Sequence, residues 1–251
     1  MSGCVLPVAI LSGGLATRLR PLTQSIPKAM IELNGEPFIA HQLRLLSSRG
    51  IQRAVLCVAY RGEMIRDFVG DGKRFGLHVD VMFDGPVLLG TAGAVRRAVP
   101  LLGDNFFVLY GDSYLPCDYL AVCSAFLHSG KRGLMTVFRN EGKFDTSNME
   151  FRNGQILRYD KMNRTPEMRH IDYGLGAFRA DVFAGLPEGV PCDLATVYKR
   201  LLSANELAAF EVSEPCRASV ERCRGGRFQP SVSVGKSASR QPERRLEASP
   251  A

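Results

Sequence analysis

The chain has 251 residues, of which 45% are hydrophobic and 23% charged, and this balance is that of an ordinary globular protein. No apolar run approaches the roughly 18 residues that a membrane helix needs, and the apolar stretch at the N-terminus is not preceded by the basic residues of a secretory signal. We therefore expect a cytoplasmic protein with no membrane contact.

The net charge of +7 is unevenly distributed along the chain. The segment from Pro215 onward contains eight Lys/Arg and three Asp/Glu, so it accounts for +5 of the total and leaves residues 1–214 nearly neutral. This distribution argues against a nucleic-acid binder, although the basic segment keeps that alternative open. The seven cysteines form no C-x-x-C pair, which favours reduced thiols over a zinc site or a disulfide framework.

Residues 1–112 alternate short apolar runs with helix-like patterns. The runs at 5–11, 54–59, 77–83 and 106–110 predict strands, and the segments 38–48, 63–69 and 92–99 predict helices. Continuous apolar strands separated by helices indicate a parallel sheet covered on both faces. We therefore predict an α/β fold whose first half, 1–112, is a Rossmann-like, doubly wound unit.

Residues 113–214 predict a mixed sheet with more antiparallel character. The expected elements are helices at 118–128 and 193–204 and strands at 134–139, 148–151, 155–159, 171–179 and 207–212, with a hairpin turn at 152–154. We assign 1–214 to one domain, of which 113–214 is the second half.

The composition changes abruptly at about Pro215. Residues 215–251 are rich in Arg, Ser, Pro and Gly and poor in apolar residues, which predicts a disordered basic tail. The change follows a strand that would be expected to continue into more sheet. Our hypothesis is that a reading-frame shift or an appended sequence produced the tail.

The most informative segment follows the first predicted strand. It begins Leu11-Ser12-Gly13-Gly14, includes Arg18 and ends near Lys28. Small residues at the ligand edge of an α/β sheet let backbone N–H groups approach a phosphate chain, and Arg and Lys supply positive charge. The string is neither a Walker A loop nor a G-x-G-x-x-G fingerprint. The alternative is a glycine-rich turn with two basic surface residues.

The whole string resembles the signature GGxGTRLxPLTxxxPKPM of the sugar-phosphate nucleotidyltransferases, and the short architecture is most similar to mannose- and heptose-1-phosphate guanylyltransferases. Two positions depart from it, because Ala16 and Ala29 replace the usual Gly and Pro. The resemblance implies that Arg18 and Lys28 are catalytic and that the nucleotide is contacted by Leu11, Gly13, Gly14, Ala16 and Thr17. The methyl group of Ala16 is expected to weaken that contact.

Two later motifs fall in the family's order. Gly90-Thr91-Ala92-Gly93 resembles the segment that lines the base and ribose, which implies nucleotide contacts for Gly90, Thr91 and Gly93; on its own it reads as a helix start with Thr91 as N-cap. Asp112 ends an apolar strand, and a carboxylate at that edge suits Mg²⁺. The resemblance implies that Asp112 is a catalytic metal ligand, whereas its alternative role is that of a turn former.

A third group implies contacts to the sugar phosphate. Lys161 resembles the family's phosphate-contacting lysine, although the usual E-K-P reads Asp160-Lys161-Met162 here. Asp172 and Gly174 fall on the family's sugar-binding strand, and the alternative for Asp172 is a turn-type aspartate.

The resemblance implies an enzyme that couples a nucleoside triphosphate to a sugar-1-phosphate, giving an NDP-sugar and pyrophosphate for nucleotide-sugar and cell-surface polysaccharide biosynthesis. It also implies that 1–112 is the nucleotide-binding half and 113–214 the sugar-binding half. One family feature is missing, because no second metal-binding carboxylate of the form D/E-I-G-x-P occurs near residue 215. The alternative is therefore an impaired or non-catalytic member that acts as a nucleotide-binding or regulatory subunit. The base, the sugar and the oligomeric state are left open, and a homo-oligomer is compatible with the sequence.

Overall fold

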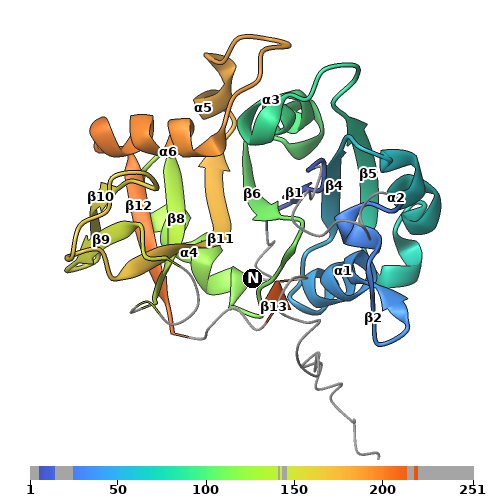
Figure 1. Ribbon diagram of the computed structural model, residues 1–251, viewed down its shortest axis with the longest axis horizontal. Coiled ribbons are helices and arrows are strands. Elements are labelled where there is room, and N and C mark those ends of the chain that lie inside the picture. The colour runs from blue at the N-terminus through green and yellow to red at the C-terminus, as the bar shows by residue number, and fades with distance from the viewer. Residues whose placement is uncertain (1–5, 15–24, 141, 143–145, 214–217, 220–251) are drawn as a thin grey trace, which may run out of the picture.

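The computed structural model describes residues 6–14, 25–140, 142, 146–213 and 218–219. Its parallel core consists of β1 (Val8–Leu11), β4 (Arg53–Val58), β5 (His78–Phe83) and β6 (Asn105–Tyr110). These strands lie in the order β6-β1-β4-β5, with Val8 aligned between Ala54 and Phe107 (Figure 1). The first half of the chain therefore forms the doubly wound sheet that its alternating pattern predicts.

The second half extends the same sheet with antiparallel pairs. Its strands are β8 (Gly133–Arg139), β9 (Met149–Arg152), β10 (Gln155–Tyr159), β11 (His170–Arg179) and β12 (Leu207–Val212). β11 runs antiparallel to β6 and joins the two halves, β9 and β10 form a hairpin, and β12 is parallel to β8. The result is one nine-stranded mixed sheet, so the predicted fold class is confirmed.

Helices cover both faces of this sheet (Figure 1). One face is packed by α1 (Phe38–Ser48), α2 (Gly62–Val69) and α4 (Tyr119–Ser129), and the other by α3 (Gly90–Leu102), α5 (Asp181–Ala184) and α6 (Leu194–Ser203). Alternate residues of a strand point to opposite faces. Val8 and Ile10 of β1 accordingly lie in one core cluster and Ala9 in the other.

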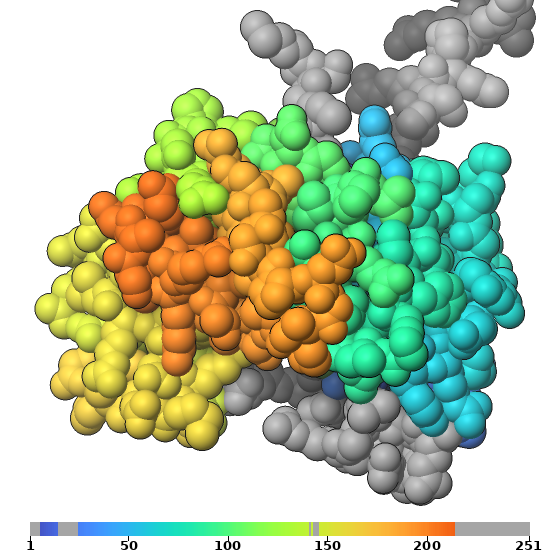
Figure 2. Space-filling view, turned by 90° about the horizontal axis from the view of Figure 1, so that it is seen from above, coloured from blue at the N-terminus to red at the C-terminus, as the bar shows by residue number. Residues whose placement is uncertain are grey.

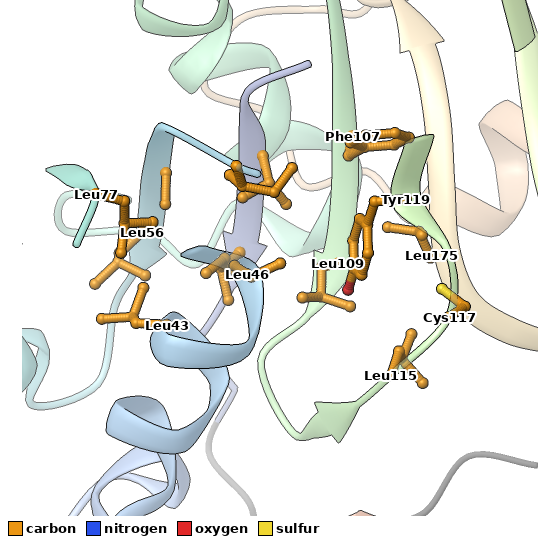
Figure 3. Packing of buried hydrophobic residues seen from close by; sticks show 14 of the residues in the cluster. Leu43, Leu46, Leu56, Leu77, Phe107, Leu109, Leu115, Cys117, Tyr119 and Leu175 are labelled. Atoms are coloured by element: carbon orange, nitrogen blue, oxygen red, sulfur yellow. The ribbon is translucent and has the colours of Figure 1, made fainter. Parts of the chain in front are cut away.

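The core under α1 and α4 anchors the edge where β6 ends. Figure 3 shows Leu43 and Leu46 of α1 near Leu56 of β4, and Phe107 and Tyr119 further along the same cluster, at β6. The rings of Phe107 and Tyr119 meet edge to face, with centroids 5.7 Å apart. This packing fixes the end of β6 and the turn that follows it.

Several short elements were not predicted from the sequence. They are β2 (Glu32–Leu33), β3 (Glu36–Pro37), β7 (Ser113–Tyr114), β13 (Ala218–Ser219) and the 3-10 turns η3 (Lys28–Met30) and η4 (Lys73–Phe75). β13 is the only described part of the predicted tail, and it pairs antiparallel with β7. At these two residues the prediction of a disordered tail is therefore wrong. None of the helices formed by the described residues is long and apolar enough to cross a membrane.

Candidate active site

The carboxyl ends of β1, β4 and β6 meet at one edge of the sheet. Just beyond β1, Ser12 N–H donates to the carbonyl of Cys57 at 2.8 Å, and Gly111 N–H donates to the carbonyl of Leu11 at 3.0 Å. A Cβ atom at Gly111 would lie 2.5 Å from the Leu11 oxygen, so only glycine fits at this crossing. The next residue, Asp112, is thereby presented at the edge.

Lys28 and Asp112, both predicted to be catalytic, form an ion pair here. Lys28 Nζ donates to Asp112 Oδ2 at 2.8 Å across 84 residues of sequence. The lysine side chain is 16% exposed, and that of the aspartate is 41% exposed. A cation and an accessible carboxylate therefore share the strand edge, which is the usual place for ligands in an open α/β sheet.

Gln42 is a part of this site that the sequence reasoning missed. Its side chain is 1% exposed, and its Nε2 donates to the carbonyl of Tyr110 at 3.1 Å and to that of Ser113 at 2.9 Å. The two bonds bridge the turn that carries Asp112. A polar residue between Ile39 and Leu46 on the buried face of α1 was the available signal.

The glycine-rich loop is only partly described. Leu11 ends β1, and Gly13 lies so close to β4 that a Cβ atom there would be 3.2 Å from Ala59 Cβ. Gly14 has open space around its Cα. The predicted contacts of Ala16, Thr17 and Arg18 lie outside the described residues. Leu11, Gly13 and Gly14 do lie at the same edge as Asp112.

The predicted N-cap role of Thr91 is wrong. The residue that precedes α3 is Leu89, and it makes no side-chain capping bond. The hydroxyl of Thr91 instead accepts the N–H of Leu194 at 2.6 Å and so caps the first turn of α6. The backbone carbonyl of Cys192 takes over the capping of α3, because it accepts the N–H of Ala92 at 2.9 Å.

Gly90 and Gly93 are both explained by close packing at this crossing. Gly90 has a φ of +69°, and a Cβ atom there would lie 2.6 Å from the Cys192 oxygen. A Cβ atom at Gly93 would approach Leu89 Cβ at 3.0 Å. The segment 190–194 therefore rests directly on the start of α3, and Figure 2 shows residues of this region packed against α3. Nucleotide contact by Gly90, Thr91 and Gly93 stays a prediction.

The three predicted sugar-phosphate residues lie together in the second half. Asp172 Oδ1 accepts the N–H of Gly174 at 2.9 Å, and Gly174 has a φ of +102°, which favours glycine. Burial raises the pKa of Asp172, while that hydrogen bond and the charge of Lys161 oppose the rise. The ammonium of Lys161 lies 5.9 Å from the ring centre of Tyr159.

Tyr110 lies between the two predicted substrate sides and was also missed. A Cβ atom at Gly174 would be 3.5 Å from both the Tyr110 ring and Ser113 Oγ, so β11 crosses β6 close to Asp112. Burial, together with the nearby Asp172 carboxylate, raises the pKa of Tyr110 well above its ordinary value. Its phenol therefore stays a neutral hydrogen-bond donor at any physiological pH.

The described residues fit a magnesium ion that relies on its substrate for most ligands. Among them, no group of three or more His, Cys, Asp or Glu side chains could hold a metal. Asp112 offers one accessible carboxylate, whose Oδ1 is 3.3 Å from Ser113 Oγ. Because Mg²⁺ commonly binds through one or two carboxylates plus phosphate oxygens and water, this single carboxylate suits it.

A doubly wound sheet with a glycine turn and a lysine–carboxylate pair at its carboxyl edge defines an α/β protein with a candidate ligand site at that edge. The family is given by comparison: residues 8–147 match the model of the nucleotidyl transferase family, and the chain belongs to that family.

Individual relatives differ in their substrates. The chain is 32% identical over 175 residues to the mannose-1-phosphate guanylyltransferase catalytic subunit beta of Xenopus tropicalis, covering 67% of this chain and 48% of the relative. It is 28% identical over 207 residues to a UTP–glucose-1-phosphate uridylyltransferase of Synechocystis sp., covering 74% and 52%. The chain thus spans about half the length of these curated relatives.

Solved structures share the fold. A Bacillus anthracis protein, provisionally described as a glucose-1-phosphate thymidylyltransferase and solved with sucrose, superposes with a TM-score of 0.76 at 18% identity, over 87% of this chain and 94% of that one. The inositol-1-phosphate CTP transferase of T. maritima gives a TM-score of 0.67 at 19% identity, over 84% and 87%.

Proposed function

We propose that the chain is a sugar-1-phosphate nucleotidyltransferase that makes an NDP-sugar and pyrophosphate from a nucleoside triphosphate and a sugar-1-phosphate. The observation that carries the proposal is the Lys28–Asp112 pair at the carboxyl edge of the sheet, in a chain of the nucleotidyl transferase family. Lys161, just after β10, and Asp172, on β11, support it, because the charge of Lys161 acts on the buried Asp172 carboxylate.

The reaction is an in-line displacement at phosphorus. A phosphate oxygen of the sugar-1-phosphate attacks the α-phosphorus, the bond from the α-phosphorus to the bridging oxygen breaks, and pyrophosphate leaves with that electron pair. The attacking phosphate is already ionised, so no general base is required. Such a transfer depends on positioning and on neutralisation of charge rather than on a protein nucleophile.

On the nucleotide side, the triphosphate would be bound by positively charged side chains and by backbone N–H groups that approach it closely. Lys28 would neutralise charge on the reacting phosphates, and Gly13 and Gly14 would let backbone N–H groups reach the triphosphate. Arg18 is predicted to bind the triphosphate as well. Asp112 would hold Mg²⁺, which when bound neutralises phosphate charge near the leaving group.

On the sugar side, Lys161 would orient the attacking phosphate, and Asp172 would accept a hydrogen bond from a sugar hydroxyl. The Tyr110 ring lies beside Gly174, and its neutral phenol would donate a hydrogen bond where the two substrates meet. In this proposal residues 1–112 serve the nucleotide and residues 113–214 the sugar. A homo-oligomer and a cytoplasmic location stay predictions.

The identity of the substrates is tested by a grid of nucleoside triphosphates and sugar-1-phosphates, with products analysed by mass spectrometry and the triphosphate labelled at its α-phosphate. We expect the label in an NDP-sugar for one preferred pair and unlabelled pyrophosphate in equal amount. Triphosphate binding without product from any pair would instead support the non-catalytic alternative.

A further inference from the structure

The loop between β5 and α3 is closed by a buried carboxylate that has no part in the chemistry described above. Asp84, the first residue after β5, is 7% exposed. Its Oδ2 accepts the N–H of Leu89 at 3.0 Å, which closes residues 84–89 into a ring. Leu89 directly precedes the Gly90–Gly93 turn, so the carboxylate acts on the start of the predicted nucleotide-binding segment.

The backbone of Asp84 is fixed on both sides as well. Its N–H donates to the carbonyl of Val58 at the end of β4 at 3.0 Å, and its own carbonyl accepts a hydrogen bond from Arg97 of α3 at 2.6 Å. Gly85 has a φ of +87° and lies against the same guanidinium. Asp84 is therefore tied to the sheet and to α3 together, which makes it a rigid base for the loop.

The peptide of Leu89 is held from the opposite direction by the second half of the chain. Its carbonyl accepts the N–H of Cys192 at 2.8 Å, while its N–H is bound by Asp84. With both ends of this residue hydrogen-bonded, the left-handed conformation of Gly90 has little freedom. The shape of the turn depends on an acceptor, the Asp84 carboxylate, on one side and on a donor, the Cys192 N–H, on the other.

We infer that Asp84 is a positioning residue for the nucleotide, which sets the conformation of the 89–93 turn through its hydrogen bond to Leu89 N–H. The inference rests on the proposed function for its consequence, because the turn is the predicted contact of the base and ribose. Asp84 itself touches neither substrate in this scheme.

The acceptor oxygen of Asp84, rather than its negative charge, performs this role. Burial raises the pKa of Asp84, while the Leu89 N–H and the charge of Arg97 oppose the rise. Burial and, to a smaller extent, the charge of Asp84 raise the pKa of the neighbouring Cys57 thiol to about 12. An asparagine keeps a carbonyl oxygen at this position and should replace the aspartate.

The experiment compares Asp84→Ala, Asp84→Asn and a matched control, Asp80→Ala. Asp80 lies four residues earlier on β5 and pairs there with Arg53 of β4 and His78 of β5. We expect Asp84→Ala to raise the KM for the triphosphate about tenfold and to leave the KM for the sugar-1-phosphate within about twofold. Asp84→Asn and Asp80→Ala should stay within about threefold of the parent in both.

Hydrogen exchange of the backbone amides at 85–93 gives a readout that does not need turnover. We expect faster exchange in Asp84→Ala and parental exchange in Asp84→Asn. Should the alanine variant not fold, Asp84→Leu removes the acceptor while keeping the volume of the side chain.

Unchanged exchange and an unchanged triphosphate KM in a folded variant without the acceptor would overturn the inference, and so would an asparagine variant as impaired as the alanine one. A parent without turnover, in which exchange at 85–93 still depends on Asp84, would count against the proposed function alone.

Discussion

Asp112 depends on a residue that lies 70 positions earlier, because the amide of Gln42 bridges the two carbonyls that flank it. Gln42→Leu would keep the volume but leave both carbonyls without their donor, at a cost of about 1–3 kcal/mol in the free energy of unfolding. A looser turn should also raise the magnesium concentration needed for half-maximal activity, by about tenfold.

The control for Gln42 is Ser48→Ala on the same helix, since the Ser48 hydroxyl donates only to the local carbonyl of Leu45. Urea unfolding and magnesium titration of the rate would be measured on both variants. A loss of stability in Gln42→Leu with a parental magnesium dependence would reduce Gln42 to a purely structural residue.

Asp160, which precedes Lys161, gives a prediction for pH. Hydrogen bonds from the backbone of Asn163 and Met162 hold the pKa of Asp160 well below its usual range. Because the folded-state pKa is lower than the unfolded one, the carboxylate adds stability above the unfolded value of about 4, and this contribution is lost as the pH falls toward the folded-state pKa. The turn at 160–163, which contains Lys161, is therefore weakened by acid.

Asp160→Asn tests this sign, because asparagine resembles the protonated acid. In urea unfolding between pH 2 and 7, we expect the parent to be more stable than the variant at neutral pH and the two to converge at the acidic end. A difference that stays constant over the whole range would show that the charge of Asp160 is irrelevant.

At the scale of elements, the two halves of the chain contact each other at the start of α3, where the segment 190–194 is hydrogen-bonded to it. Gly90 has a positive φ, and a Cβ atom there would clash with the Cys192 carbonyl. Gly90→Ala should therefore lower the free energy of unfolding by more than the roughly 1 kcal/mol of an alanine in the left-handed region alone. Gly103, at the other end of α3, has a φ of +76° and open space around its Cα.

Gly103→Ala is therefore the matched control, because it measures the effect of a positive φ on an alanine without a steric clash. We expect Gly90→Ala to lower the free energy of unfolding by about 2–4 kcal/mol and Gly103→Ala by about 1 kcal/mol. Equal losses in the two variants would mean that the 190–194 segment yields easily and does not brace the turn.

The elements themselves were largely predictable from the sequence. The helix over 38–48 has the predicted bounds, because its apolar period is regular and Pro37 precedes it. The hairpin at 152–154 is confirmed, since Asn153 and Gly154 both adopt positive φ. The four-residue α5 is too short to leave a periodic signal, and the N-cap at Thr91 was wrong because a carbonyl 101 positions later competes for the helix end.

The site was less predictable than the elements. Lys28 was predicted at this edge from the loop motif and the resemblance, and Asp112 from its place at the end of an apolar strand; their ion pair shows that the two residues meet there. The roles of Gln42, Asp84 and Cys192 arise from contacts between residues distant in sequence, and no local pattern marks them apart from one polar residue on a buried helical face. The contacts of Arg18 stay a prediction.

At the scale of the whole molecule, β11 makes one sheet of two halves that serve different substrates in our proposal. Its antiparallel pairing with β6 carries Asp172 and Gly174 to the end of the strand that precedes Asp112. The segment 190–194 forms a second connection on α3. The β6–β11 pairing and the contact of 190–194 with α3 therefore fix the proposed nucleotide side relative to the proposed sugar side.

The measurement that tests the central claim most directly is magnesium-dependent pyrophosphate release from the preferred substrate pair by the parent, Asp112→Asn and Asp80→Asn. The account predicts release by the parent and by Asp80→Asn at similar rates, and a rate at least about 100-fold lower for Asp112→Asn, because its amide is a far weaker ligand for Mg²⁺. Release by Asp112→Asn at the parental rate would contradict the assignment of the active site to this edge of the sheet.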